Sequence, residues 1–98
     1  MKATYLLLLI GLITLPINSQ TAEEYLKNAS AKFYNDDYYG AIADFNKAIE
    51  LNPDDASAYY NRGAVKSSLG DDNGACQDGR KAQQLGFDAT KLNDLVCN

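Results

Sequence analysis

The sequence contains no histidine and no tryptophan, and only two of its 98 residues are cysteine. Without histidine, neither a Ser-His nor a Cys-His nucleophilic pair is available, and a zinc site would need ligands beyond the two cysteines. No glycine-rich loop stands between a strand and a helix to bind phosphate. Carboxylates cluster at predicted helix starts and not in an apolar pocket that would raise a pKa. We therefore expect no enzymatic activity, no metal site and no cofactor.

Long basic stretches are also absent. Lys and Arg number 9 against 13 Asp and Glu, for a net charge of −4, and Arg80 and Lys81 form the only adjacent basic pair. Nucleic acids and anionic membrane surfaces are bound mainly by clustered positive charge. Neither is therefore an expected partner.

The N-terminal end has the pattern of a secretory signal peptide. A lysine precedes an apolar run over residues 5–15, and a proline and small polar residues follow. A bilayer span takes about 20 residues, so the run is too short to cross comfortably. We expect cleavage between Ser19 and Gln20, which makes 1–19 the signal peptide and the mature protein secreted or periplasmic, without membrane insertion. Cleavage after Ala22 and an uncleaved signal anchor are the alternatives.

Residues 20–98 repeat themselves with a period of 34 residues. The matched positions are Tyr25 and Tyr59, Ala29 and Gly63, Ala41 and Ala75, Ala48 and Ala82, and Leu51 and Leu85. This pattern resembles the tetratricopeptide repeat family, whose helix–turn–helix units bury their apolar faces by stacking on neighbours. The resemblance implies an all-α fold, a fragment of a right-handed α-solenoid. Repeat one would cover 22–55, repeat two 56–87, and a capping helix 88–97.

Helix start signals divide these residues further. The predicted helices cover 22–35, 38–51, 56–69, 71–85 and 88–96. Thr21 and Glu24 form a capping-box pattern. Acidic pairs at 36–37, 54–55 and 71–72 precede the next three helices, where aspartate accepts backbone N–H bonds and complements the helix dipole. The last pair faintly resembles the start of a calcium loop, but the alternating ligands and closing glutamate of that motif are missing, so capping is favoured.

The second repeat departs from the family pattern. Gly79 stands where the first repeat has Phe45, and Phe87 stands where it has Pro53. A glycine within a helix costs about 1 kcal/mol relative to alanine. We expect the capping helix to pack closely over Gly79, with Phe87 supplying the lost volume. In the first repeat, Lys32 occupies a position where the family prefers an aromatic residue.

Cys76 and Cys97 form an even cysteine count in a small exported domain, which favours a disulfide. If the last two helices fold back as an antiparallel hairpin, both thiols lie about 13 Å from the turn, at about 1.5 Å per residue. The bridge would close a loop of about 20 residues and contribute roughly 3 kcal/mol. Two free buried thiols are one alternative. A redox-active pair is another, although the Cys-x-x-Cys spacing typical of such pairs is missing.

The resemblance implies a protein–protein interaction module whose groove is lined by the first helix of each repeat. The stripes that would face this groove are Glu23, Leu26, Ser30 and Phe33 from repeat one, and Ser57, Tyr60, Ala64 and Ser67 from repeat two. Leu26, Phe33 and Tyr60 are large residues that the predicted core does not need. We expect them to anchor an unidentified peptide or partner helix. Incidental exposure, or packing against a missing third repeat, is the alternative.

Two further expectations concern the partner. Family members that grip the acidic C-termini of chaperones use a lysine and an asparagine where this chain has Leu26 and Ser30, and only Asn61 matches, so an acidic ligand is not expected. Because three or more repeats are usually needed for stability, a structural role is the alternative function. The domain would then stack on itself as a homodimer or dock onto a larger envelope complex. Residues 81–86 also resemble Sel1-like repeats, which would leave the interaction hypothesis unchanged.

Overall fold

The computed structural model describes residues 20–98, so the predicted signal peptide lies outside the described residues. Across this range the chain forms five α-helices and no strand. They are α2 (Ala22–Tyr34), α3 (Tyr38–Leu51), α4 (Ala56–Ser68), α5 (Asp72–Gln84) and α6 (Thr90–Val96). Of the helices described, none is both long enough and apolar enough to cross a membrane. The all-α prediction is confirmed.

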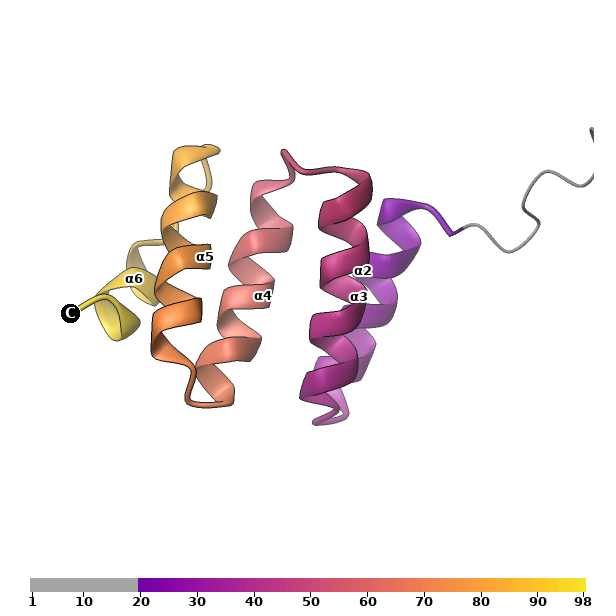
Figure 1. The fold of residues 1–98 in the computed structure, drawn as a ribbon, viewed down its shortest axis with the longest axis horizontal. Helices are drawn as coiled ribbons and strands as arrows, with labels where there is room; N and C mark the ends of the chain where they lie inside the picture. The colour runs from indigo at the N-terminus through magenta and orange to yellow at the C-terminus, as the bar shows by residue number, and fades with distance from the viewer. Residues whose placement is uncertain (1–19) are drawn as a thin grey trace, which may run out of the picture.

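The helices form a short stack of antiparallel pairs. Helix α2 packs on α3 and α4 packs on α5, while α3 also packs on α4 and joins the two pairs. Figure 1 shows α3, α4 and α5 side by side, with the short α6 at the end of the row. Helix α6 contacts both α5 and α4. This arrangement is the predicted one of two helix–turn–helix units closed by a terminal helix, a fragment of an α-solenoid.

Side-chain caps begin the first four helices. The Thr21 hydroxyl oxygen accepts a hydrogen bond from the Glu24 N–H at 3.1 Å, and the Glu24 carboxylate accepts from the Thr21 N–H at 3.5 Å, which completes the predicted capping box. One member of each acidic pair caps the next helix, namely Asp37, Asp55 and Asp71. These carboxylates accept backbone N–H bonds that the first helical turn leaves unpaired. The capping interpretation of the acidic pairs is confirmed.

The turns after the first helix of each repeat require a positive φ. Gly70, after α4, has a φ of 82°, and Asp36, at the matching place after α2, has a φ of 61°. Glycine adopts this region without steric strain, and aspartate and asparagine adopt it more readily than most residues. The Asp36 side chain therefore extends from a turn whose backbone direction is set by the repeat.

The core consists of two clusters built largely from small residues. The first contains Ala29, Ala41, Phe45 and Val65, with Leu26, Phe33, Tyr38 and Ile42 packed around it. The second contains Ala75, Leu92 and Val96, with Tyr60 and the two cysteines packed around it. Val65 belongs to α4 but lies in the cluster of the first repeat, so it joins the repeats. Leu92 and Val96 belong to α6, so the terminal helix completes the second cluster.

Helix α6 packs directly over Gly79, as predicted. A Cβ atom at Gly79 would collide with the Asn93 side chain and lie 3.4 Å from Cδ2 of Leu92. The expectation that Phe87 replaces the missing aromatic volume is wrong, because Leu92 and Asn93 occupy that space. The Phe87 ring instead stacks on Tyr60, with ring centroids 4.6 Å apart. The turn at Gly86, with a φ of 98°, precedes Phe87 and separates it from α5.

Cys76 and Cys97 are joined by a disulfide, with Cα atoms 5.0 Å apart, in agreement with the predicted pairing. The bridge ties the end of α6 to α5. Helix α6 begins at Thr90 and not at residue 88 as expected, because the Asp88 carboxylate accepts hydrogen bonds from the Thr90 N–H at 3.1 Å and the Thr90 hydroxyl at 2.7 Å. This local turn holds Asp88 outside the helix.

Candidate functional site

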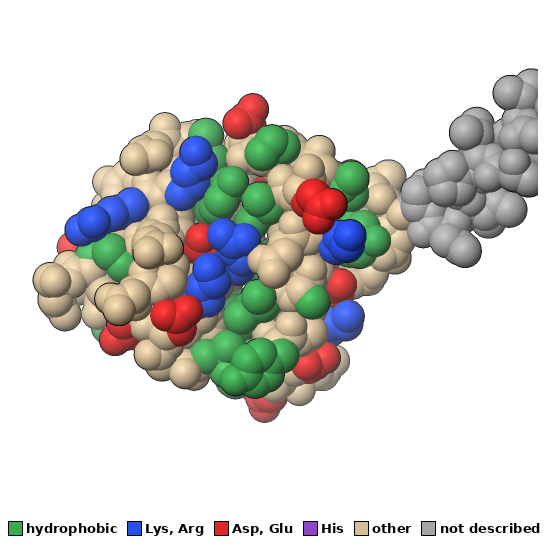
Figure 2. All heavy atoms as spheres, in the orientation of Figure 1, with side chains coloured by type: hydrophobic (Ala, Val, Ile, Leu, Met, Phe, Trp, Pro, Cys, Tyr) green, Lys and Arg blue, Asp and Glu red, His purple; other side chains and the backbone are tan. Residues whose placement is uncertain are grey.

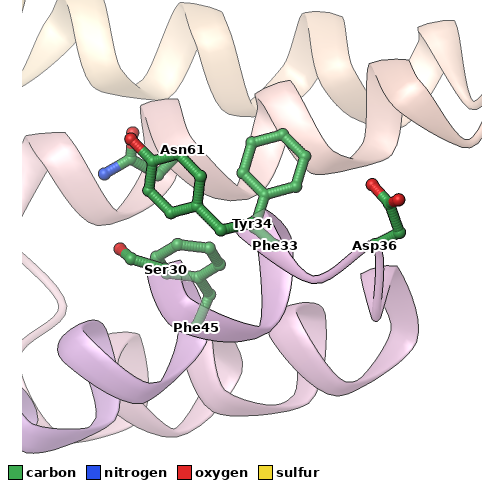
Figure 3. Close-up of a pocket in the computed structure, with 6 residues that line it drawn as sticks. All are labelled: Ser30, Phe33, Tyr34, Asp36, Phe45 and Asn61. Carbon is green, nitrogen blue, oxygen red and sulfur yellow. The ribbon is translucent and has the colours of Figure 1, made fainter.

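A hollow of about 430 Å³ lies on the side of the stack formed by the first helices of the two repeats. Its lining comprises Ser30, Phe33 and Tyr34 from α2, Asp36 from the following turn, Phe45 from α3 and Asn61 from α4. Figure 3 shows the rings of Phe33 and Tyr34 between Asp36 and the pair formed by Ser30 and Asn61. Aromatic surface is thus flanked by polar groups at both ends.

Tyr38 braces two of these residues from the start of α3. Its ring contacts the Phe33 ring edge to face, with centroids 5.7 Å apart. Its hydroxyl donates a hydrogen bond to the Asp36 carboxylate at 3.3 Å. The nearby negative charge of Asp36 raises the pKa of Tyr38. Phe45 is 1% exposed and part of the core, whereas Tyr34 is 89% exposed. The hollow therefore has a fixed base and one exposed aromatic wall.

The structure brings only some of the predicted groove residues together. Ser30 and Phe33 line the hollow. The other predicted partner-binding residues, Leu26, Tyr60, Ala64 and Ser67, are partly buried outside that lining. Of the two remaining stripe residues, Glu23 is exposed, and Ser57 is partly buried with its hydroxyl donating to Asp55 at 2.7 Å.

The expectation that the core does not need Leu26, Phe33 and Tyr60 is wrong. Leu26 and Phe33 pack on the first core cluster, and Tyr60 packs on the second. The buried residues are mostly alanines and glycines, which leave space that larger flanking side chains must cover. The partner-binding role of these residues stays a prediction.

The predicted groove stripes did not include Tyr34 and Asp36, which line the hollow. Both follow the predicted stripe immediately, at the end of α2 and in the turn after it. The sequence carried one signal for this position. Tyr34 directly precedes polar turn residues, where an aromatic ring has no core to pack against. Asn61 had been considered only as a match to chaperone-binding repeats.

One lysine of each first helix is paired with a carboxylate of the second helix of its repeat. Lys32 of α2 lies 2.8 Å from the Asp44 carboxylate of α3, and Lys66 of α4 lies 3.0 Å from the Asp78 carboxylate of α5. Lys32 and Lys66 are one 34-residue period apart, and so are Asp44 and Asp78. The same ion pair therefore occurs once in each repeat. Hydrogen bonding to Asp44 raises the pKa of Lys32. The lysine that departs from the family pattern is therefore half of a repeated ion pair.

Arg62 enlarges the second of these pairs. Its Nε and Nη2 groups donate to the two Asp78 oxygens at 2.8 and 2.6 Å, a bidentate geometry. Its Nη1 group donates to the Asn46 side chain at 2.9 Å and so links the repeats. Hydrogen bonding to Asp78 raises the pKa of Arg62. Figure 2 shows Lys and Arg side chains gathered around an acidic side chain over α4 and α5.

The site offers little for metal or covalent chemistry. Among residues 20–98, no group of three or more His, Cys, Asp or Glu side chains is placed to hold a metal ion. The two cysteines are consumed by the disulfide. What the arrangement provides is a shaped surface with aromatic faces, hydrogen-bonding groups and one carboxylate.

Stacked antiparallel helix pairs, crossing at small residues and hollowed on the side of the first helices, define a helical-repeat protein of the α-solenoid class. Comparison with known proteins gives the family, since residues 29–70 match the family described as TPR repeat. The chain belongs to the tetratricopeptide repeat family, as the 34-residue period predicted. Repeats of this family indicate a protein–protein interaction module, and their fold is typically a non-catalytic scaffold.

Two curated relatives share this similarity. The chain is 36% identical to Protein STIP1 homolog of Dictyostelium discoideum over 74 residues. These aligned residues make up 76% of this chain and 13% of the relative. The chain is 39% identical to Tetratricopeptide repeat protein 36 homolog of Nematostella vectensis over 64 residues. These aligned residues make up 65% of this chain and 35% of the relative. The chain thus spans a small part of these relatives.

Two solved structures share the fold. A crystal structure of MamA superposes with a TM-score of 0.75 at 33% identity, over 78% of this chain and 46% of that one. A second crystal structure of MamA protein gives a TM-score of 0.69 at 27% identity, over 82% of this chain and 51% of that one. The described helices therefore match about half of a longer helical stack.

Proposed function

We propose that this protein is an exported interaction module that binds an extended peptide, or a helix of a partner protein, along the first helices of its two repeats. The observation that supports the proposal is the hollow between α2 and α4, because it combines aromatic walls with polar groups from both repeats. A ligand lying along it would contact repeat one and repeat two together.

The lining suits a ligand side chain that inserts between the repeats. Phe45 provides an apolar base, and Phe33 and Tyr34 provide aromatic walls. The Ser30 hydroxyl and the Asn61 amide can bond to a peptide backbone. Binding sites of this kind are mostly apolar with a few placed polar groups, and aromatic anchors carry much of the affinity in peptide recognition. Leu26, Tyr60, Ala64 and Ser67 would extend the contact beyond the hollow.

Selection from a displayed library of random peptides tests this proposal. We expect the wild-type protein to enrich a family of sequences and Tyr34→Ala to weaken their binding by about tenfold or more, as for an aromatic anchor. Tyr39→Ala is the matched control, because Tyr39 is 78% exposed on α3 and lies outside the lining of the hollow. Equal losses in the two variants, or no enriched family, would argue against a binding site here.

Export is part of the proposal and rests on two features. The N-terminal segment has the signal-peptide pattern, and the disulfide is typical of proteins in oxidising compartments. Sequencing the N-terminus of the protein recovered from the medium or cell envelope tests it. A terminus at Gln20 is expected and one at Glu23 would mark the alternative cleavage site, whereas Met1 retained in a membrane fraction would show an anchor.

Self-assembly is the second candidate function, favoured by one observation. Leu95 is 68% exposed on α6, the helix that ends the described stack. Light scattering across a range of concentrations separates the two candidates, because a peptide-binding module stays monomeric. A dimer that Leu95→Asp dissociates would favour assembly, and a constant monomer mass would exclude it.

A further inference from the structure

We infer that the hollow selects ligands by a basic side chain, so that the residue inserted between α2 and α4 is lysine or arginine. This inference rests on the proposed peptide-binding function and adds the chemistry of the ligand. It is carried by the charges in and around the hollow, by the position of the aromatic rings, and by the fixed place of Asp36.

The lining of the hollow is acidic and aromatic. Within residues 20–98, the side chains that line it include the Asp36 carboxylate and three aromatic rings, but no lysine or arginine. An acidic ligand would therefore meet a carboxylate without a compensating cation. A purely apolar ligand would leave Asp36 desolvated beside it, which is unfavourable for a charge. A basic side chain satisfies both the carboxylate and the rings.

The cations nearest in sequence to the hollow are engaged elsewhere. Lys32, which directly precedes Phe33, is paired with Asp44 of α3 at 2.8 Å. Arg62, which directly follows Asn61, forms its bidentate contact with Asp78 of α5. Lys32 and Arg62 thus direct their positive charge toward the second helices. Lys27, the other lysine of α2, is exposed and is not among the residues that line the hollow. The negative charge of Asp36 is left as the formal charge of the lining.

Asp36 is held in a defined place. Its backbone adopts a φ of 61° in the turn after α2, and its carboxylate accepts a hydrogen bond from the Tyr38 hydroxyl. Figure 3 shows this carboxylate at one end of the hollow, with the Phe33 and Tyr34 rings next along it. A ligand cation between the carboxylate and a ring face would gain an ion pair and a cation–π contact together. Its aliphatic stem would lie against apolar surface.

The overall charge supports the same ligand. The full chain carries a net charge of −4, so a basic peptide is attracted during its approach and an acidic one is repelled. Because the hollow is open to solvent, this attraction should weaken as salt is added.

The experiment uses protein purified from expression of the full 98-residue chain and a displayed library of random peptides. We expect the enriched peptides to share a lysine or arginine next to an apolar or aromatic residue. In the enriched peptide that binds most tightly, replacing the basic residue by glutamine should weaken binding by about tenfold. This is the combined effect of an exposed ion pair and a cation–π contact. Replacing it by glutamate should weaken binding further.

The matched protein variants are Asp36→Asn and Asp54→Asn. Asparagine tolerates the positive φ at residue 36, so Asp36→Asn removes the charge and keeps the turn. We expect it to weaken binding of the basic peptide several-fold and to reduce the salt dependence of binding. Asp54 is an exposed carboxylate in the turn between α3 and α4, outside the lining of the hollow. Asp54→Asn should leave both quantities unchanged.

The outcomes separate this inference from the proposed function. Peptides that lose binding in Tyr34→Ala but show no basic residue, and bind Asp36→Asn as well as wild type, would overturn the inference and leave the groove intact. Enrichment of acidic peptides would overturn it directly. If no peptide depends on Tyr34, both the proposed function and the inference fail.

Discussion

Asp78 is the one charged residue that is buried among those the structure describes, and we expect Asp78→Ala to remove much of the stability of the domain. Its carboxylate accepts two hydrogen bonds from Arg62, at 2.8 and 2.6 Å, and lies 3.0 Å from the Lys66 ammonium. The side chains of Arg62 and Lys66 are only 18% and 21% exposed. Alanine would leave both cations without a counter-charge.

The expected loss follows from this burial. Removing one partner of a buried ion pair costs about 3–5 kcal/mol, since the remaining charge stays desolvated. The free energy of unfolding of a typical domain is about 5–15 kcal/mol. Small domains bury a smaller fraction of their surface than large domains do. In a domain of this size, 1 kcal/mol shifts Tm by about 4–8 °C. We therefore expect Tm to fall by at least about 12 °C.

The first repeat provides the control. Asp44 occupies the matching position, but its partner Lys32 is 43% exposed, and ion pairs open to solvent contribute little. Urea unfolding of the disulfide-bonded protein, followed by circular dichroism, should therefore show a far smaller loss for Asp44→Ala than for Asp78→Ala. Replacing the whole cluster, with Arg62→Met, Lys66→Met and Asp78→Leu, should recover most of the loss. Similar losses at the two positions would refute the argument from burial.

Three further predictions concern the second repeat and its terminal helix. Gly63→Ala should destabilise the domain by about 1–2 kcal/mol in urea unfolding, because the added Cβ atom would lie 3.0 Å from Cβ of Asp78 and 3.2 Å from a backbone oxygen. Gly79→Ala should cost less, because its Cβ atom would meet the flexible Asn93 side chain. Replacing both cysteines by alanine should cost about 3 kcal/mol and speed hydrogen exchange in α6, a seven-residue helix too short to persist alone, while exchange in α2 and α3 stays slow. Hydrogen bonds from Thr90 lower the pKa of Asp88, so their stabilisation is present above the ordinary aspartate pKa and lost as the pH falls through the lowered value. Thr90→Val should raise the pKa of Asp88 toward its usual range in a carboxyl NMR titration, and an unchanged titration would contradict this reading.

Much of the fold was predictable because local signals and the repeat period agree. Each acidic pair precedes a helix that one of its members caps, and Gly70 and Gly86 mark the ends of α4 and α5 with positive φ values. The predicted and observed helix bounds agree to within two residues at every end. The cysteine spacing also predicted the disulfide, since it depends only on helix rise and on a hairpin between the last two helices.

Side-chain partnerships across helices were not predictable in the same way. Lys32 appeared only as a departure from the family pattern, because its meaning depends on Asp44 twelve positions later on another helix. Tyr60 and Phe87 were assigned to a groove and to a core gap, yet they stack on each other. The spacing of residues along a helix predicts which face each residue occupies, but not whether a neighbouring helix covers that face.

The repeated ion pair also bears on what the groove can recognise. The sequence argued against an acidic ligand because Leu26 and Ser30 stand where chaperone-binding repeats carry a lysine and an asparagine. The structure adds a separate reason, since Lys32 of α2 and Lys66 of α4 are paired with carboxylates of the second helices. Freeing Lys32 to reach an acidic ligand would break its pair with Asp44 and leave that carboxylate, 15% exposed, without a counter-charge. The contacts that stabilise each helix pair therefore also hold Lys32 and Lys66 against the second helices, which supports the proposed basic ligand over an acidic one.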